Sequence, residues 1–308
     1  MVMSLATKIG NITIRNPMIL ASGVLGTTYS TLNRMYEAGL GAVITKSIGA
    51  KSRAGNPNPS VFALNEIRSV INSVGLANPG YQIFREHIEI LMKNSTPTIV
   101  SIFGENKEEF KEVLEGLKDL PVLAFELNFS CLNTEMGGAQ IGTDPDLVYK
   151  IVKELRAKTK TPLWVKLTPN VSDVIEIASA AVKGGCDTLV AINTLKAMVI
   201  DIHTKQPILG YKKGGLSGAA IKPVGIRYVY DLYEHFGDKI PLIGVGGIFR
   251  GEDIIEYLLA GASAVEIGTS LGVAYPENMV RFFQMKIKKY MKDQQIDSIG
   301  EITGGAHK

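Results

Sequence analysis

Cysteine is scarce in this sequence, and its scarcity excludes two kinds of site. The 308 residues include only two cysteines, Cys131 and Cys186, and only four histidines. Two thiols cannot build a disulfide framework, and they cannot supply the four thiolates that a ferredoxin-type iron–sulfur cluster requires. The histidines show no metal-site spacing, so we expect no bound metal.

Long apolar runs and blocks of one charge are also missing. No apolar stretch reaches the roughly 18 residues of a membrane-spanning helix. The first twenty residues scatter polar groups where a signal peptide would be apolar. Net charge is only +3, with no Lys/Arg cluster among aromatic residues, so we expect no nucleic-acid partner. These absences favour a cytoplasmic globular enzyme without a membrane partner.

What the chain does have is an alternation of short β-branched runs with longer amphipathic segments, such as 106–120 and 143–159. Eight βα units predict a TIM (β/α)8 barrel formed by residues 1–308 as a single domain, and a doubly wound sheet is the less favoured alternative. Segments 48–80 and 194–220 are expected to be inserted loops at its C-terminal face. The predicted strands are PMILAS (17–22), GAVITKS (41–47), PTIVSIF (97–103), VLAFELN (122–128), PLWVKLT (162–168), DTLVAIN (187–193), PLIGVGG (241–247) and ASAVEIG (262–268).

Polar residues recur where these strands end, which is where TIM barrels carry their active sites. Lys46 and Lys166 lie on otherwise apolar strands, Asn128 ends the fourth strand, and Asn193 and Thr194 follow the sixth. Burying an ammonium costs several kcal/mol unless it meets an anion or a polar partner. Because VITKS and WVKLT contain no adjacent acid, we favour a ligand-facing role for both lysines over a carboxylate partner inside the barrel.

Glycines after the last two strands indicate a phosphate site. Gly246, Gly247 and Gly268 let backbone N–H groups approach a ligand closely, and the helix expected to begin in GIFRGEDIIEYLLAG adds a favourable dipole. A phosphate site, two strand lysines and several asparagines suggest a flat, amide-rich ligand held over flavin mononucleotide (FMN). A phosphorylated metabolite without redox chemistry fits the same residues.

Several long stretches resemble dihydroorotate dehydrogenase, in order and over nearly the whole chain. They are NSVGLANPG (72–80), ELNFSCLNTEMGG (126–138), VKLTPNVSD (165–173), the stretch 192–223, GVGGI (244–248) and AGASAVEIGT (260–269). The sequence is most similar to the catalytic subunit of the soluble, NAD-linked class 1B enzymes. The fumarate-using class 1A is an alternative within the family, and a non-redox phosphate-binding barrel such as an aldolase, or a binding-only barrel, is an alternative outside it.

The resemblance implies oxidation of (S)-dihydroorotate to orotate in pyrimidine biosynthesis. A hydride would pass from C6 to N5 of one FMN per chain, while Cys131, in a polar glycine-rich stretch, would act as the base for the C5 proton. Cys186, at the start of the sixth strand, is expected to be a packed core residue instead.

The same resemblance assigns binding residues. The substrate would be bound by Lys46, Asn72, Ser73, Val74, Gly75, Leu76, Asn128, Asn193 and Thr194. FMN would be bound by Ser22, Lys46, Ser47, Asn128, Lys166, Ile192, Gly218, Gly246, Gly247, Gly268 and Thr269. The chain departs from the family pattern at Leu132, where proline usually follows the cysteine, at Ser101, where asparagine is usual, and at Phe129, where an aliphatic residue is usual.

Transfer of electrons to NAD would need a second protein. The chain has too few cysteines for an iron–sulfur cluster and no G-x-G-x-x-G between a strand and a helix. The resemblance therefore implies a partner subunit carrying FAD and [2Fe–2S], in a heterotetramer of two plus two built on a homodimer of this chain. We expect no amphipathic N-terminal extension of the kind found in the membrane-bound, quinone-using class.

Overall fold

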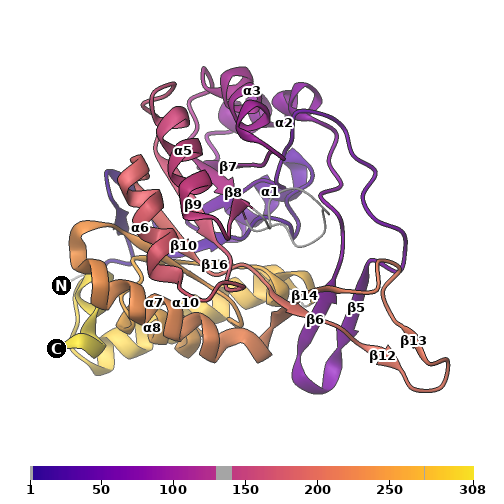
Figure 1. The fold of residues 1–308 in the computed structure, drawn as a ribbon. Coiled ribbons are helices and arrows are strands. Elements are labelled where there is room, and N and C mark those ends of the chain that lie inside the picture. The colour runs from indigo at the N-terminus through magenta and orange to yellow at the C-terminus, as the bar shows by residue number, and fades with distance from the viewer. Residues whose placement is uncertain (1–2, 130–140, 274) are drawn as a thin grey trace.

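A closed barrel of eight parallel strands forms the centre of the computed structural model, which describes residues 3–129, 141–273 and 275–308 (Figure 1). Each strand lies within one of the eight predicted runs, and the barrel closes where the last strand pairs with the first. The TIM-barrel prediction is therefore confirmed. The barrel strands are β3 (Met18–Leu20), β4 (Ala42–Ile44), β7 (Thr98–Ile102), β8 (Ala124–Asn128), β9 (Leu163–Leu167), β10 (Thr188–Ala191), β15 (Leu242–Val245) and β16 (Ala264–Ile267).

Helices follow the barrel strands and cover the outside of the barrel (Figure 1). They are α1 (Tyr29–Glu37), α2 (Tyr81–Lys93), α3 (Lys107–Leu117), α5 (Pro145–Arg156), α6 (Val174–Gly184), α7 (Lys222–Phe236), α8 (Gly251–Leu259), α9 (Thr269–Val273) and α10 (Pro276–Asp293). Among the described residues, no helix combines the length and apolarity needed to cross a membrane.

Local sequence explains where these helices begin and which face they bury. The Asn106 side chain caps α3 by accepting from the backbone N–H of Glu109, and Asp144 caps α5 ahead of Pro145. The predicted stripe of α3 faces the core, with Phe110 and Leu114 among its buried residues. Both amphipathic segments singled out in the sequence are therefore helices.

An apolar floor fills the amino-terminal half of the barrel interior. It includes a hairpin of β1 (Thr7–Ile9) and β2 (Ile12–Ile14), whose isoleucines pack under the barrel strands. The buried members of this floor are Ile9, Ile12, Ile14, Ile19, Ala42, Ile44, Ile99, Ala124, Trp164, Val190, Ile243 and Ala264. Burial of this cluster seals one end of the barrel, so a ligand has to enter from the other end.

Polar side chains lie directly above the floor. Because strand side chains alternate, residues two positions after a floor residue also face the interior. Glu126, Lys166 and Glu266 follow Ala124, Trp164 and Ala264 by two positions, and all three are buried. The interior thus changes from apolar to charged within one layer.

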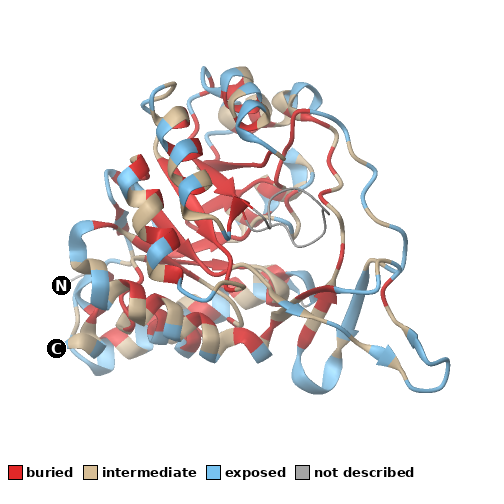
Figure 2. Cartoon of the chain, in the orientation of Figure 1, coloured by how far each residue is buried: buried red, intermediate tan, exposed pale blue. Residues whose placement is uncertain are grey.

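The two inserted segments form a second sheet, which the sequence reasoning did not foresee. Its strands run in the order β11 (Leu195–Ala197), β14 (Gly214–Gly218), β6 (Ser69–Asn72) and β5 (Val61–Leu64), and a small hairpin of β12 (Ile200–Asp201) and β13 (Gln206–Pro207) extends from it. It projects from the barrel away from the two termini (Figure 1) and is exposed over much of its surface (Figure 2). The inserted segments therefore contain strands that their weak periodicity did not predict.

Candidate active site

A cavity of about 380 Å³ opens at the carboxyl ends of the barrel strands, within the range of about 300 to 1,000 Å³ usual for small-molecule sites. It brings together the predicted residues Ser22, Lys46, Ser47, Asn72, Val74, Gly75, Leu76, Asn128, Lys166, Ile192, Asn193, Thr194, Gly218, Gly246, Gly247, Gly268 and Thr269. Ser73 is the exception among the described ones: it is fully buried outside the cavity lining, and its N–H donates to the carbonyl of Ser60. Cys131 and Leu132 lie outside the described residues.

The second sheet supplies one wall of this cavity. Antiparallel pairing of β6 with β14 sets Asn72 opposite Gly215 and Ser69 opposite Gly218, and the Asn72 amide donates to the Gly215 carbonyl at 3.3 Å. Gly218 has φ +97°, and a Cβ there would lie 2.5 Å from the Cα of Ser69. Only glycine therefore allows this close approach of the two strands at the cavity wall.

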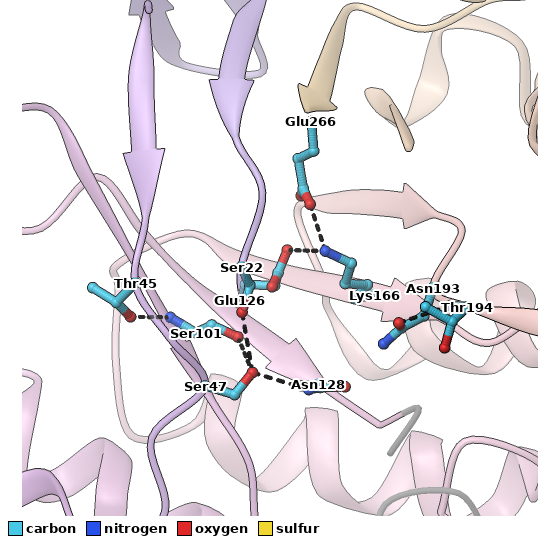
Figure 3. A network of polar contacts seen from close by, with 10 residues as sticks. All are labelled: Ser22, Thr45, Ser47, Ser101, Glu126, Asn128, Lys166, Asn193, Thr194 and Glu266. Atoms are coloured by element: carbon cyan, nitrogen blue, oxygen red, sulfur yellow. Dashed lines mark hydrogen bonds and ion pairs between the residues drawn. The ribbon is translucent and has the colours of Figure 1, made fainter. Parts of the chain in front are cut away.

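Hydroxyl groups from neighbouring strands join in a network centred on Ser47 (Figure 3). Its Oγ accepts from the Asn128 amide at 3.0 Å and lies 3.1 Å from Oγ of Ser22 and 3.0 Å from Oγ of Ser101. Ser101 is buried, and its N–H donates to Oγ1 of Thr45. Ser101, which replaces the family's usual asparagine, therefore does not line the cavity itself but helps to orient Ser47, which does.

The segment of the cavity wall just before β11 is held by Asn170, which the sequence reasoning did not single out. The Asn170 amide donates to the Thr194 carbonyl at 3.0 Å and accepts from the N–H of Lys196 at 2.9 Å. The N–H of Thr194 in turn donates to Oδ1 of Asn193 at 2.8 Å. Asn193 and Thr194 are thus fixed as a polar edge that can hydrogen-bond a planar amide-rich ligand.

A glycine-rich corner follows β15 and β16. Gly246 and Gly247 have φ of +126° and +69°, and a Cβ on Gly247 would lie 2.5 Å from Cβ of Lys222. The neighbouring Ser270 lines the cavity, and its buried Oγ has no hydrogen-bond partner among the described residues. Exposed backbone and a spare hydroxyl are what a phosphate needs, so these residues fit the phosphate end of FMN.

The sequence predicted that the start of α8 would point its dipole at the phosphate, but the structure does not place the start of α8 in this glycine-rich corner. In its stretch, beyond Gly247, only Ile248 and Phe249 of the described residues line the cavity. The Asp253 carboxylate accepts from the backbone N–H groups of Phe249 and Arg250, both at 2.9 Å. The protein's own carboxylate therefore uses the donors that a bound phosphate would otherwise meet.

Lys166 has the carboxylate partners that its local sequence did not suggest. Its Nζ lies 2.5 Å from Oε2 of Glu266 and 3.5 Å from Oε2 of Glu126, and its side chain is 6% exposed (Figure 3). Burial alone lowers the pKa of Lys166, but the two carboxylates outweigh it and raise that pKa above its ordinary value. The preference for a lysine without a carboxylate partner was wrong, because the acids lie on other strands.

The scarce cysteine that the structure describes is inert. Cys186 is 8% exposed just before β10, and burial, with a smaller effect of Asp187, raises the pKa of its thiol to about 12. This agrees with the predicted packing role. Phe129 likewise packs, with its ring edge-on to Phe110 at 5.2 Å between centroids.

Comparison with known proteins decides the family. The family model for dihydroorotate dehydrogenase matches residues 4–291. The chain belongs to the dihydroorotate dehydrogenase family. Among its relatives, proteins named dihydroorotate dehydrogenase B (NAD(+)), catalytic subunit, are 49% identical in Methanocella arvoryzae and 46% identical in Methanocaldococcus jannaschii, covering 99% and 98% of both chains, respectively. A protein of the same name in Thermoplasma volcanium is 44% identical over 99% of both chains.

The sequence reasoning missed two further residues that line this cavity, Glu266 and Ser217. Glu266 lines the cavity, and Ser217 holds Thr269 through an Oγ–Oγ1 contact of 3.1 Å. A signal for Glu266 was present: an acid in the middle of an apolar strand, VEI, has to find a partner when that strand is buried. No comparable signal marked Ser217, because its strand was not predicted.

Proposed function

We propose that this chain is the catalytic subunit of an NAD-linked, class 1B dihydroorotate dehydrogenase, which oxidises (S)-dihydroorotate to orotate with bound FMN in pyrimidine biosynthesis. The observation that carries the proposal is a cavity at the carboxyl ends of the barrel that is lined by residues assigned to both substrate and FMN. Family membership and the names of the relatives support the same reaction.

FMN would be held by backbone at one end and by side chains at the other. Gly246, Gly247, Gly268 and Thr269 would meet its phosphate and ribityl chain. The residues Ser22, Ser47, Asn128, Lys166, Ile192 and Gly218 would meet the remainder of the cofactor. When bound, FMN supplies the two-electron acceptor for the hydride that leaves C6 of dihydroorotate. The buried Lys166 ammonium would be among the residues that hold FMN, and it would supply positive charge to the cofactor.

The substrate would lie between the second sheet and the strand ends. Asn128, Asn193 and Thr194 offer amide and hydroxyl groups to the edges of the pyrimidine ring, and Lys46 and the segment 72–76 close the other side. Cys131 would take the C5 proton on its sulfur. An ordinary thiol has a pKa of about 8.5, so this role needs a thiolate favoured by its surroundings.

The electron acceptor and assembly belong to the same proposal. We infer a partner subunit carrying FAD and [2Fe–2S], a heterotetramer of two plus two on a homodimeric core, and action in the cytoplasm. Support comes from the relatives' name, which specifies a catalytic subunit and NAD(+), and from the two cysteines, too few for a cluster in this chain.

A three-way acceptor assay tests this proposal. The purified chain is given (S)-dihydroorotate with a redox dye, with fumarate or with NAD, and orotate formation is followed. We expect orotate with the dye and none with NAD unless the partner subunit is added. Turnover with fumarate at the rate seen with the dye would assign class 1A instead. A colourless chain that cannot be reconstituted with FMN would contradict the proposal altogether.

A further inference from the structure

The charged layer above the apolar floor consists of one cation between two acids (Figure 3). Glu126 on β8 and Lys166 on β9 come from adjacent strands, whereas Glu266 reaches Lys166 from β16 across the barrel interior. Both glutamate side chains are fully buried. The ion pairs are therefore removed from bulk water, where unbalanced charge is most costly.

Two ionised glutamates would leave this layer with a net charge of −1. Among the described residues, Lys166 is the one cation within 4 Å of Glu126 or Glu266. Lys46 also lines the cavity but forms an ion pair with neither glutamate. The strand residues paired in register with the three are uncharged: Ile19, Ser101, Asn128, Trp164, Val190 and Val245. With both glutamates ionised, the direct ion pairs would thus hold two carboxylates on one ammonium between the floor and the cavity.

The glutamate oxygens give independent evidence of this imbalance. Oε1 of Glu126 and Oε1 of Glu266 are both buried, and neither has a hydrogen-bond partner among the described residues. Burial and then the neighbouring Glu126 raise the pKa of Glu266 well above that of an ordinary carboxyl, despite Lys166. A side-chain hydrogen bond between the two glutamates is among the causes that raise this pKa. A protonated carboxyl is neutral and can donate such a bond, so one added proton lowers the net charge and supplies the donor that the unpaired oxygens lack.

We propose that Glu126 and Glu266 share one proton, so that with Lys166 they form a neutral triad that sets how much positive charge Lys166 presents to the cavity. The two glutamates are positioning residues, which act through the lysine. The shared proton rests on the triad itself, and its effect on the cofactor rests on the proposed function. A lysine balanced by one carboxylate attracts electrons to a neighbouring ring less than an unpaired lysine would.

Infrared spectroscopy of the cofactor-free protein at about pH 8 tests the shared proton, since exposed carboxyls are ionised there and lack the carbonyl stretch of a protonated acid. We expect this band in the unmodified protein and its loss in both Glu126→Gln and Glu266→Gln, because the remaining acid becomes the ionised partner of Lys166. Glu256→Gln is the matched control: it removes a half-exposed carboxylate 2.6 Å from Lys222 and should keep the band. Absence of the band from the unmodified protein, or its survival in either triad variant, would overturn the proposal.

A redox titration of bound FMN tests the effect on the cofactor. Each single variant keeps one carboxylate beside Lys166, so the midpoint potential should stay close to that of the unmodified protein. The double variant Glu126→Gln/Glu266→Gln removes the counter-charge, so its potential should rise. Equal upward steps for the two single variants, adding in the double variant, would mean two full negative charges and would refute the shared proton. Failure of every variant and of the unmodified chain to bind FMN would count against the proposed function, while the infrared band would still decide the triad.

Discussion

Cys131 and Cys186 are the chain's two thiols, and we assign them different roles: Cys131 as a proposed catalytic base and Cys186 as a packed core residue. The pKa of about 12 for Cys186, which results from burial, leaves almost no thiolate at neutral pH. Cys131 belongs to a polar, glycine-rich stretch outside the described residues, and its proposed role is proton abstraction. Cys186 can therefore serve as the control when the role of Cys131 is tested by substitution.

Replacing Cys131 by alanine should therefore remove steady turnover while FMN stays bound. The loss should be at least about 10²-fold in kcat, the usual contribution of a general base. Cys131→Ser should retain little activity and require a higher pH, since a hydroxyl is a much weaker acid than a thiol. Steady-state rates across pH check both variants, with Cys186→Ala as the control that should keep the rate. Unchanged turnover in Cys131→Ala would remove this residue from the mechanism.

Glu266 should make the stability of the protein depend on pH. Its pKa in the folded state is raised above the ordinary 4.5, so between these two values the folded state binds more protons than the unfolded state. The stabilisation that protonated Glu266 adds to the folded state is complete below about pH 4.5, and it is lost as the pH rises through the folded-state pKa. The free energy of unfolding should thus fall more steeply with pH in the unmodified protein than in Glu266→Gln.

Urea denaturation at several values from about pH 5 to pH 8 measures this difference. Glu256→Gln serves again as the control and should follow the unmodified protein. Parallel pH profiles for the unmodified protein and Glu266→Gln would contradict the raised pKa.

Residue patterns along the chain predicted which polar groups gather at the cavity, but not which ion-pair partners neutralise the charged ones. Lys46, Asn128 and Lys166 could be found because polar residues ending apolar strands are conspicuous. The partners of Lys166 could not be found in the same way, because Glu266 meets it only once the barrel closes. Pairing across a closed sheet depends on strand order, which a search of neighbouring sequence does not contain.

At the scale of elements, the barrel strands and the strands of the second sheet differ in how far sequence determines them. Barrel strands are buried on both faces, so they appear as continuous apolar runs. β5 is almost entirely exposed, and β12 and β13 have two residues each, so none of them leaves a hydrophobic pattern. Their pairing comes from contacts between segments far apart in the chain, such as β6 with β14.

Close packing of β6 against β14 should be needed for ligand binding. Gly218→Ala adds a methyl group 2.5 Å from the Cα of Ser69 at φ +97°, so the two strands have to separate at the cavity wall. We expect at least about a tenfold loss of FMN affinity, which corresponds to about 1.4 kcal/mol. Fluorescence titration of FMN into the cofactor-free protein measures it.

Gly237→Ala is the matched control for this substitution. Gly237 also has a positive φ, +57°, but a Cβ there meets nothing within 4 Å. It therefore shares the backbone cost without the clash and should keep its FMN affinity. Equal affinities for the two variants would mean that the approach of β6 and β14 does not shape the site.

At the scale of the whole molecule, the fold separates a sealed end from an open one. The β1–β2 hairpin and the apolar floor close the amino-terminal end of the barrel, while the second sheet raises a wall beside the carboxyl end. Charged residues occupy the layer between floor and cavity. A cofactor and a substrate stacked at the open end would be shielded from water on one side and accessible to a partner on the other.

The central claim is that this cavity brings dihydroorotate and FMN together for direct hydride transfer, and a single-turnover reaction tests it most directly. The FMN-loaded chain is mixed with (S)-dihydroorotate without oxygen, and the flavin absorption and the orotate formed are measured together. The account predicts bleaching of the flavin with one orotate formed for each FMN. A flavin-loaded chain that stays oxidised in excess dihydroorotate would contradict it.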